Sequence, residues 1–319
     1  MLYNFFMNVA RIGKYLVPPP LRPRLREEYT YFVRNVYDRR VKKNRDSYMK
    51  NGTYLDWYAE QCDNDAKNNL SSNNSDAKKV PARLDWMGTG VGQLSMAVEL
   101  GLKPQHTLLE FGCGFMRAAN HFIGYLDDSN YSGNDASAER VAHGGKVTAE
   151  ILGAEVYRRK NPHLYVNKDN TFDWVTGQTF DFIWSCSVLA HMPEADIATL
   201  LANVRKIMNE KSAFIFSYST AELDKFRRWE HCSPDERKKG IRERAKQRNH
   251  MFIVRALQAH QGEDCIEVDT VNWFHTLNFY KKICEPLGLE VSDISHILQK
   301  EDCPGYDYAA RLARVTLKK

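Results

Sequence analysis

Short apolar runs alternate with amphipathic helical patterns from residue 107 onward. The apolar runs predict buried strands at residues 107–111, 130–135, 163–167, 180–185 and 212–218. Between them, apolar residues recur every three or four positions and predict helices over 138–152 and after Pro193. Strands and helices that alternate at this length predict a doubly wound α/β fold, with a mostly parallel sheet and helices on both faces. Ligands of such sheets bind beyond the carboxyl ends of the strands, here after Phe111, Asn134, Asn167 and Ser185.

Both ends of the chain extend this pattern. Downstream, we expect a helix over 276–286 and strands at 289–294 and 309–317. Upstream, residues 27–60 have a helical pattern, whereas 63–79 consist mainly of Asn, Asp, Ser and Lys and predict a flexible linker. We therefore divide the chain into three parts: a basic helical arm (1–62), a polar linker (63–79) and a main domain (80–319). The main domain carries a charge-rich, helical cap insertion at about 220–270, where insertions commonly cover the acceptor site.

The composition narrows the class of protein. The chain has 319 residues, 43% hydrophobic and 27% charged, which excludes a disordered, collagen-like or polytopic membrane protein. Residues 1–50 hold 12 Lys and Arg against 4 Asp and Glu, so the remaining residues carry a net charge of −3 within the total of +5. A domain of this charge argues against a nucleic-acid partner.

The basic N-terminal segment and the cysteines indicate where in the cell the protein is expected. Residues 1–26 combine apolar positions at helical spacing with cations, which fits an arm packed on its own domain or on a dimer mate. Peripheral contact with a membrane stays open as the other interpretation. The seven cysteines form no CxxC pair, and the N-terminus lacks a small-residue cleavage site, so we expect a cytoplasmic protein, with membrane contact at most peripheral. No metal site and no oligomeric state are predicted.

A glycine turn follows the first predicted strand. Gly112 and Gly114 let a ligand approach the backbone closely, but Arg117 stands where a dinucleotide site needs a third glycine. NAD is therefore disfavoured, and no Gly-Lys-Ser/Thr follows to form a P-loop. Asp135 ends the next strand, where a carboxylate can accept hydrogen bonds from both hydroxyls of an adenosine ribose.

The order LLEFGCG, YSGNDAS, NKDNTF and FDFIWSCSVLAHMP resembles class I S-adenosylmethionine-dependent methyltransferases over about 85–218, with further matches in 272–319. The resemblance implies S-adenosyl-L-methionine as cofactor and a Rossmann-like seven-stranded sheet whose last strand is antiparallel. It also implies that the helix over 85–93 closes the cofactor pocket. Met116 departs from the family, where many members have a further glycine.

The same resemblance assigns roles to the residues that match its motifs. It places Gly112, Cys113 and Gly114 under the methionine part of the cofactor, with Glu110 placing the loop or meeting the amino group. Asp135 would hold the ribose, Asp169 with Asn170 would meet the adenine amino group, and Ser185 would face the cofactor near its sulfonium.

The acceptor determines whether a base is needed. A hydroxyl acceptor must lose a proton, and His191, six residues after Ser185, is the best-placed candidate; the alternative is a histidine that only bonds backbone at the helix start. The residues after the fourth strand lack the signatures of DNA-amino, cytosine-C5 and metal-assisted catechol enzymes. We therefore expect O-methylation of a small-molecule or saccharide-like acceptor. Two alternatives stay open: an RNA or protein methyltransferase that docks through the basic arm, and a non-catalytic cofactor-binding partner protein.

Overall fold

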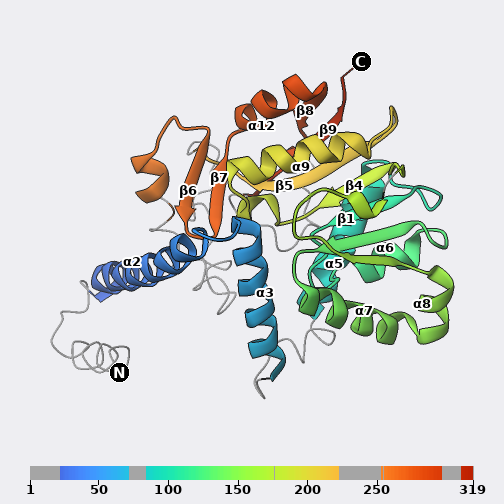
Figure 1. Ribbon diagram of the computed structural model, residues 1–319, viewed down its shortest axis with the longest axis horizontal. Coiled ribbons are helices and arrows are strands. Elements are labelled where there is room, and N and C mark those ends of the chain that lie inside the picture. The colour runs from blue at the N-terminus through green and yellow to red at the C-terminus, as the bar shows by residue number, and fades with distance from the viewer. Residues whose placement is uncertain are drawn as a thin grey trace.

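A seven-stranded sheet organises the computed structural model, which describes residues 22–71, 84–175, 177–222, 253, 255–296 and 310–318 (Figure 1). Among these residues the strand order is β3-β2-β1-β4-β5-β9-β8. The strands are β1 (Leu108–Phe111), β2 (Tyr131–Asp135), β3 (His163–Val166), β4 (Phe182–Ser185), β5 (Ala213–Ser219), β8 (Leu289–Asp293) and β9 (Ala310–Leu317). Strands β1 to β5 are parallel, and β9 pairs antiparallel with both β5 and β8. The predicted α/β fold with an antiparallel last strand is confirmed.

Alternation along the strands divides the core into two layers. In β5, for example, Phe214 and Phe216 enter one apolar cluster, while Ile215 enters the other. The first layer is closed by α9 (Glu194–Lys206) and α12 (Leu277–Cys284), and the second by α5 (Leu84–Glu99), α6 (Ala119–Tyr125) and α7 (Ala138–Leu152). A short helix, α8 (Ala154–Lys160), leads from α7 to β3. A sheet covered on both faces explains why its strands are continuous apolar runs.

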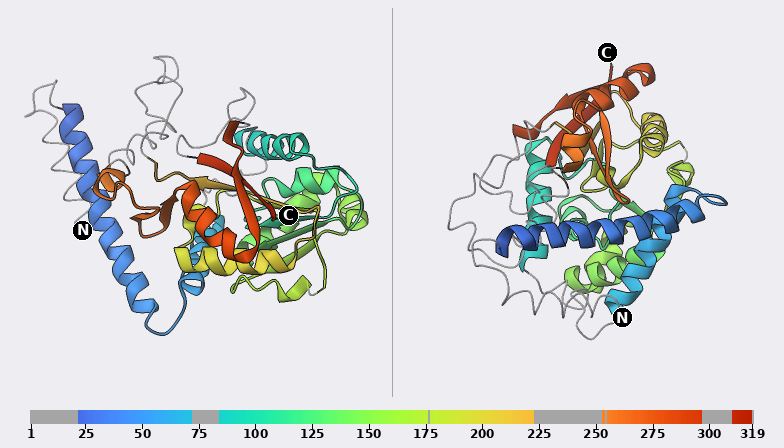
Figure 2. Two further views of the ribbon diagram at one scale, coloured as in Figure 1. Left: turned by 90° about the horizontal axis from the view of Figure 1, so that it is seen from above. Right: turned by 90° about the vertical axis from the view of Figure 1, so that its left-hand side faces the viewer.

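Two N-terminal helices lie beside this domain (Figures 1 and 2). They are α2 (Arg22–Tyr48) and α3 (Tyr54–Ser71), and α2 is the long helix at one end of the molecule in Figure 2. The predicted flexible linker is wrong for residues 63–71, because α3 continues through them. Asp63 accepts hydrogen bonds from the Ser137 hydroxyl at 2.5 Å and the Glu139 N–H at 3.3 Å, at the N-terminus of α7. This contact, favoured by the helix dipole, outweighs the poor helix propensity of the Asn and Asp residues.

A hairpin that the sequence analysis missed packs against α2. Strands β6 (Cys265–Asp269) and β7 (Asn272–His275) pair antiparallel, so the predicted helical cap is wrong for residues 265–269. Ile266 and Val268 alternate with polar residues and bury one face, which is a strand signal. Predictions for residues 1–21, 72–83 and 223–252 lie outside the described residues, and the division into arm, linker and domain stays a prediction. Within the described part of the chain, no helix is long and apolar enough to cross a membrane.

Three short 3₁₀ helices complete the described elements. They are η3 (Asp173–Val175), η4 (Leu189–His191) and η7 (Glu285–Leu287). The second of these follows β4 and carries His191 at its end, close to β7.

We expect His275, at the end of β7, to make the stability of the fold depend on pH. Its side chain is fully buried, stacks on Phe279 with ring centroids 4.7 Å apart, and has the Tyr280 hydroxyl 3.2 Å from Nδ1. Burial lowers the pKa of His275 to about 3, whereas an unfolded histidine has a pKa of about 6.5. Between these values the unfolded chain binds the additional proton. The free energy of unfolding should therefore fall on acidification, by up to about 1.4 kcal/mol per pH unit.

Urea unfolding between pH 7.5 and 5 measures this slope. His275→Gln should reduce it, because the variant carries no titrating group at this position, while the exposed His260→Gln should leave it unchanged. Equal slopes for wild type and His275→Gln would contradict the assignment.

Candidate functional site

The glycine turn after β1 is fixed by sterics and by backbone hydrogen bonds. Gly112 and Gly114 have φ angles of 76° and 53°, in the region that favours glycine. A Cβ on Gly112 would lie 2.3 Å from Cγ2 of Val188, so no larger residue fits there. The N–H groups of Gly112 and Cys113 donate to the Asn134 carbonyl at 2.8 and 2.9 Å, which ties the turn to the end of β2.

Asp135 completes the connection between the two loops. Its Oδ2 accepts from the Gly114 N–H at 3.0 Å, and its Oδ1 accepts from the Ser137 N–H at 2.9 Å. Burial raises the pKa of Asp135, while these two donors and the Arg140 guanidinium oppose the increase. Each carboxylate oxygen keeps a lone pair, so Asp135 can still accept bonds from a diol.

A cavity of about 120 Å³ lies at this edge of the sheet. Its wall includes residues from all four loops predicted to carry the chemistry, after Phe111, Asn134, Asn167 and Ser185. Among the predicted site residues, the wall contains Gly112, Gly114, Asp135, Asn170 and His191.

The other predicted site residues lie behind the wall or away from it. Glu110 is buried, accepts a hydrogen bond from the Tyr131 hydroxyl at 2.6 Å, and has its pKa raised to about 7 by burial. Cys113 is buried, and burial raises its pKa well above the ordinary value. The exposed Asp169 carboxylate accepts bonds from the N–H and hydroxyl of Thr171, at 3.0 and 2.9 Å.

Two asparagines on the wall carry unpaired polar atoms that the sequence analysis did not single out. The Asn134 and Asn167 side chains line the cavity, and both residues are almost completely buried. Asn134 Oδ1 and Asn167 Nδ2 have no hydrogen-bond partner within the described part of the chain, and neither does the buried hydroxyl of Ser185 at the end of β4. Buried polar atoms usually have partners, so an acceptor and a donor left over on a cavity wall fit a polar ligand such as a nucleoside. Their positions at strand ends were the available signal.

One wall of the cavity comes from α3, which contributes Tyr54, Leu55 and Tyr58. The expected closing helix over 85–93 lies in α5, and none of the wall residues described comes from it. Gln93 of α5 instead accepts a hydrogen bond from the Trp184 indole at 2.9 Å, within the buried core. The helix that closes the described cavity is therefore α3.

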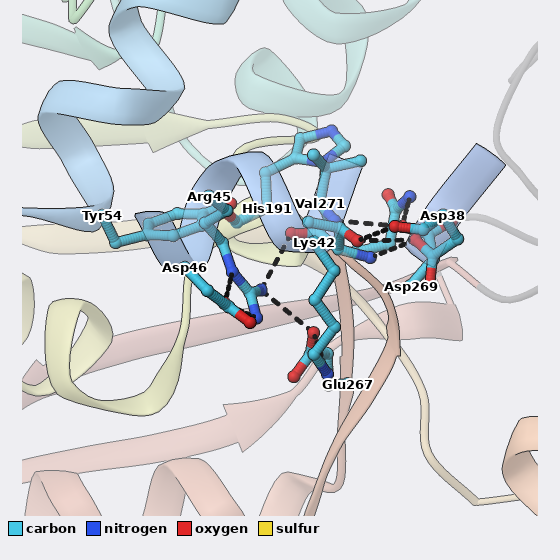
Figure 3. Close-up of polar contacts among 11 residues, drawn as sticks. Asp38, Lys42, Arg45, Asp46, Tyr54, His191, Glu267, Asp269 and Val271 are labelled. Atoms are coloured by element: carbon cyan, nitrogen blue, oxygen red, sulfur yellow. Dashed lines mark hydrogen bonds and ion pairs between the residues drawn. The ribbon is translucent and has the colours of Figure 1, made fainter. Parts of the chain in front are cut away.

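His191 lines the cavity and is held by three contacts; Figure 3 shows it beside Tyr54 and Val271. Its Nδ1 is 2.8 Å from the carbonyl oxygen of Val271. The Tyr58 ring stacks on the imidazole at 5.8 Å, and the Tyr54 hydroxyl donates to the His191 carbonyl at 2.9 Å. Because a carbonyl only accepts, the ring hydrogen must lie on Nδ1, and Nε2 keeps its lone pair.

The same surroundings favour the neutral imidazole. Burial lowers the pKa of His191; the Val271 carbonyl and Asp269 act in the opposite direction, and Arg140 adds to the lowering. Nδ1 thus bonds the backbone of the β6–β7 turn and not that at the start of the helix, which was the alternative for this histidine. No group of three or more His, Cys, Asp or Glu residues in the described ranges could hold a metal ion.

The comparisons agree with this geometry. The sequence pattern of a family described as a methyltransferase domain matches residues 73–292. No curated protein matches the chain. Among solved structures, the chain is similar to the magnesium protoporphyrin IX methyltransferase ChlM from Synechocystis PCC 6803 with bound SAH, at 12% identity and a TM-score of 0.50. That alignment covers 82% of this chain and 97% of the other, and shows a shared fold.

Two further structures have lower TM-scores. The glycopeptide N-methyltransferase MtfA is 16% identical, with a TM-score of 0.47 and coverage of 72% of this chain and 90% of the other. A TehB-like SAM-dependent methyltransferase from Corynebacterium glutamicum ATCC 13032 Kitasato is 14% identical, with a TM-score of 0.43 and coverage of 72% and 88%.

The site predicts different consequences for its two aspartates. Asp135→Ala removes a half-buried acceptor on the cavity wall, which should cost roughly 2–4 kcal/mol and weaken S-adenosylhomocysteine binding about 30- to 800-fold. Asp169→Ala removes a carboxylate that is exposed and already bonded to Thr171, so its affinity should stay close to that of the wild type. Calorimetric titration of both folded variants measures this. Unchanged affinity in Asp135→Ala would remove this residue from the cofactor site.

Proposed function

Because the chain belongs to the methyltransferase domain family, we propose that it O-methylates a small-molecule or saccharide-like acceptor, with His191 as the general base. S-adenosyl-L-methionine, when bound, supplies an electrophilic methyl carbon on its sulfonium. The residues of this chain would bind the cofactor, orient the acceptor hydroxyl and take its proton.

The observation that carries the proposal is the arrangement of His191. A neutral imidazole with its hydrogen committed to the Val271 carbonyl has a single basic nitrogen, Nε2, on a ring that lines the cavity. Nε2 would accept the proton that the acceptor hydroxyl loses, while the acceptor oxygen takes the methyl group and the cofactor leaves as S-adenosylhomocysteine. A histidine with this orientation and a lowered pKa is ready to act as a base near neutral pH.

The cofactor would lie between the glycine turn and the ends of β2 and β3. Asp135 would accept from the ribose hydroxyls, and Gly112 and Gly114 would allow close approach of the backbone. The unpaired Asn134 Oδ1 and Asn167 Nδ2 would complete their hydrogen bonds with polar atoms of the nucleoside.

The contacts of the basic arm favour a small acceptor over docking on RNA. Arg34, Lys42 and Arg45 make ion pairs with acidic residues of the β6–β7 hairpin. These cations are therefore already neutralised within the protein rather than presented to phosphates. A non-catalytic role predicts no methyl transfer to any acceptor, which the assay below also tests.

Replacement of His191 tests the base. Transfer of labelled methyl from S-adenosylmethionine to a pool of hydroxylated small molecules and saccharides identifies the acceptor. With this acceptor, His191→Gln should lower turnover by about 100-fold or more, because proton removal is lost. Its affinity for S-adenosylhomocysteine should stay the same. The exposed His260→Gln is the matched control and should keep full turnover. A decrease of less than about tenfold in His191→Gln would reject the base role.

The pH profile provides a second test. Since burial lowers the pKa of His191, the base remains neutral below pH 6.5, the ordinary pKa of histidine. Turnover at saturating S-adenosylmethionine should stay level on acidification to that point and fall only at lower pH. The groups that act on the ring are Tyr58, Asp269 and Arg140, of which Asp269 opposes the lowering and Arg140 adds to it. A rate that falls already between pH 8 and 7 would contradict a neutral buried base.

A further inference from the structure

One face of α2 holds the turn that joins β6 and β7. Asp38 accepts two hydrogen bonds from Thr270, from its backbone N–H at 2.8 Å and from its hydroxyl at 2.6 Å. Arg45 donates to the carbonyl oxygen of the same threonine at 3.2 Å. Thr270 is only 1% exposed, so two residues of one helix satisfy its N–H, its hydroxyl and its carbonyl out of contact with water.

Ion pairs on either side strengthen this contact (Figure 3). Arg34 lies 2.5 Å from the Asp269 carboxylate, and Arg45 lies 3.0 Å from that of Glu267. The other oxygen of Asp269 accepts a hydrogen bond from the Val271 N–H at 3.1 Å. Asp269 therefore connects α2 to the turn itself.

These contacts fix both polar groups of the peptide bond between Thr270 and Val271. Arg45 holds its carbonyl, and Asp269 holds its N–H. The next carbonyl along the chain, that of Val271, is the one that receives the Nδ1 hydrogen of His191. The Val271 carbonyl directly follows the Thr270–Val271 peptide bond, whose two polar groups are hydrogen-bonded. The direction of this carbonyl therefore depends on the contact with α2.

We propose that Asp38 and Arg45 are positioning residues for His191: they hold the Thr270–Val271 turn so that the Val271 carbonyl keeps the imidazole hydrogen on Nδ1. The inference rests on the proposed function for its effect on methyl transfer, whereas the tautomer can be observed without any acceptor. The inference gives the basic helix α2 a role within the protein, which is to hold the turn that orients His191.

The position of the ring hydrogen of His191 matters because neutral imidazole has two tautomers. With the hydrogen on Nδ1, Nε2 can accept a proton; with the hydrogen on Nε2, that nitrogen is a donor and cannot act as a base. The partner of the other ring nitrogen decides which tautomer is present. Loss of the Val271 acceptor would therefore remove basic character from Nε2 without any change in the cofactor residues.

The test uses the full chain labelled with ¹⁵N-histidine and saturated with S-adenosylhomocysteine. Nitrogen spectra report which ring nitrogen of His191 carries the hydrogen, and the His191→Gln spectrum identifies its signals. The wild type should show only the Nδ1–H tautomer. Asp38→Ala and Thr270→Val should show a mixture of both tautomers, with turnover about tenfold lower and unchanged S-adenosylhomocysteine affinity.

Two matched variants make the result specific. Lys43→Ala changes an exposed cation of α2 and should keep the wild-type tautomer and turnover. Asp38→Asn retains an oxygen acceptor of similar shape and should retain the tautomer better than Asp38→Ala. Thr270→Val leaves the ion pairs of Arg34 and Arg45 with the hairpin in place, so it answers the question even where Asp38→Ala fails to fold.

A single Nδ1–H tautomer in folded Asp38→Ala or in Thr270→Val would overturn the positioning role. Full turnover in His191→Gln, together with mixed tautomers in the α2 variants, would refute the base in the proposed function and support the positioning role. The two ideas can therefore fail separately.

Discussion

Parallel pairing of β2, β1 and β4 is the constraint on which the site depends, because it places three strand ends at one edge of the sheet. Two glycine-turn N–H groups bond to the Asn134 carbonyl, and the Asp135 carboxylate bonds to Gly114. The loop after β1 therefore cannot move without the loop after β2. The cavity wall is built on backbone held in this way, which suits a site that must align two reacting molecules.

The site is completed by elements outside this sheet. The family match begins at residue 73, yet Tyr54 and Tyr58 of α3 form part of the cavity wall and contact His191. The β6–β7 turn supplies the other contact of this histidine, through Val271. The central sheet thus provides the glycine turn and strand ends, while α3, which precedes the family match, and the hairpin, which lies within it, determine the surroundings of the candidate base.

Patterns local in sequence predicted the fold and the loops that line the cavity, since period and strand-end position are local properties. The methyltransferase family predicted from four motifs is confirmed by the match over 73–292, and the helix predicted at 138–152 has the same bounds in α7. Contacts distant in sequence could not be predicted in this way. The bonds from Tyr54 to His191 and from Asp38 to Thr270 span 137 and 232 residues, and no pattern in either segment indicates the other.

The number of cations in a segment likewise does not tell which of them are already paired within the folded protein. The cations of residues 1–50 left packing on the protein itself, a membrane surface and docking on an RNA or protein as alternatives, and Arg34 and Arg45 face Asp269 and Glu267 across a partly buried contact. Leaving one charge of such a pair without its partner is strongly destabilising, even where the intact pair contributes little net stability. Lys43, outside the contact, is exposed to solvent, as is Lys42 despite its ion pair, whereas Arg45 is buried, so the part of the charge that could attract a partner is smaller than the composition implies.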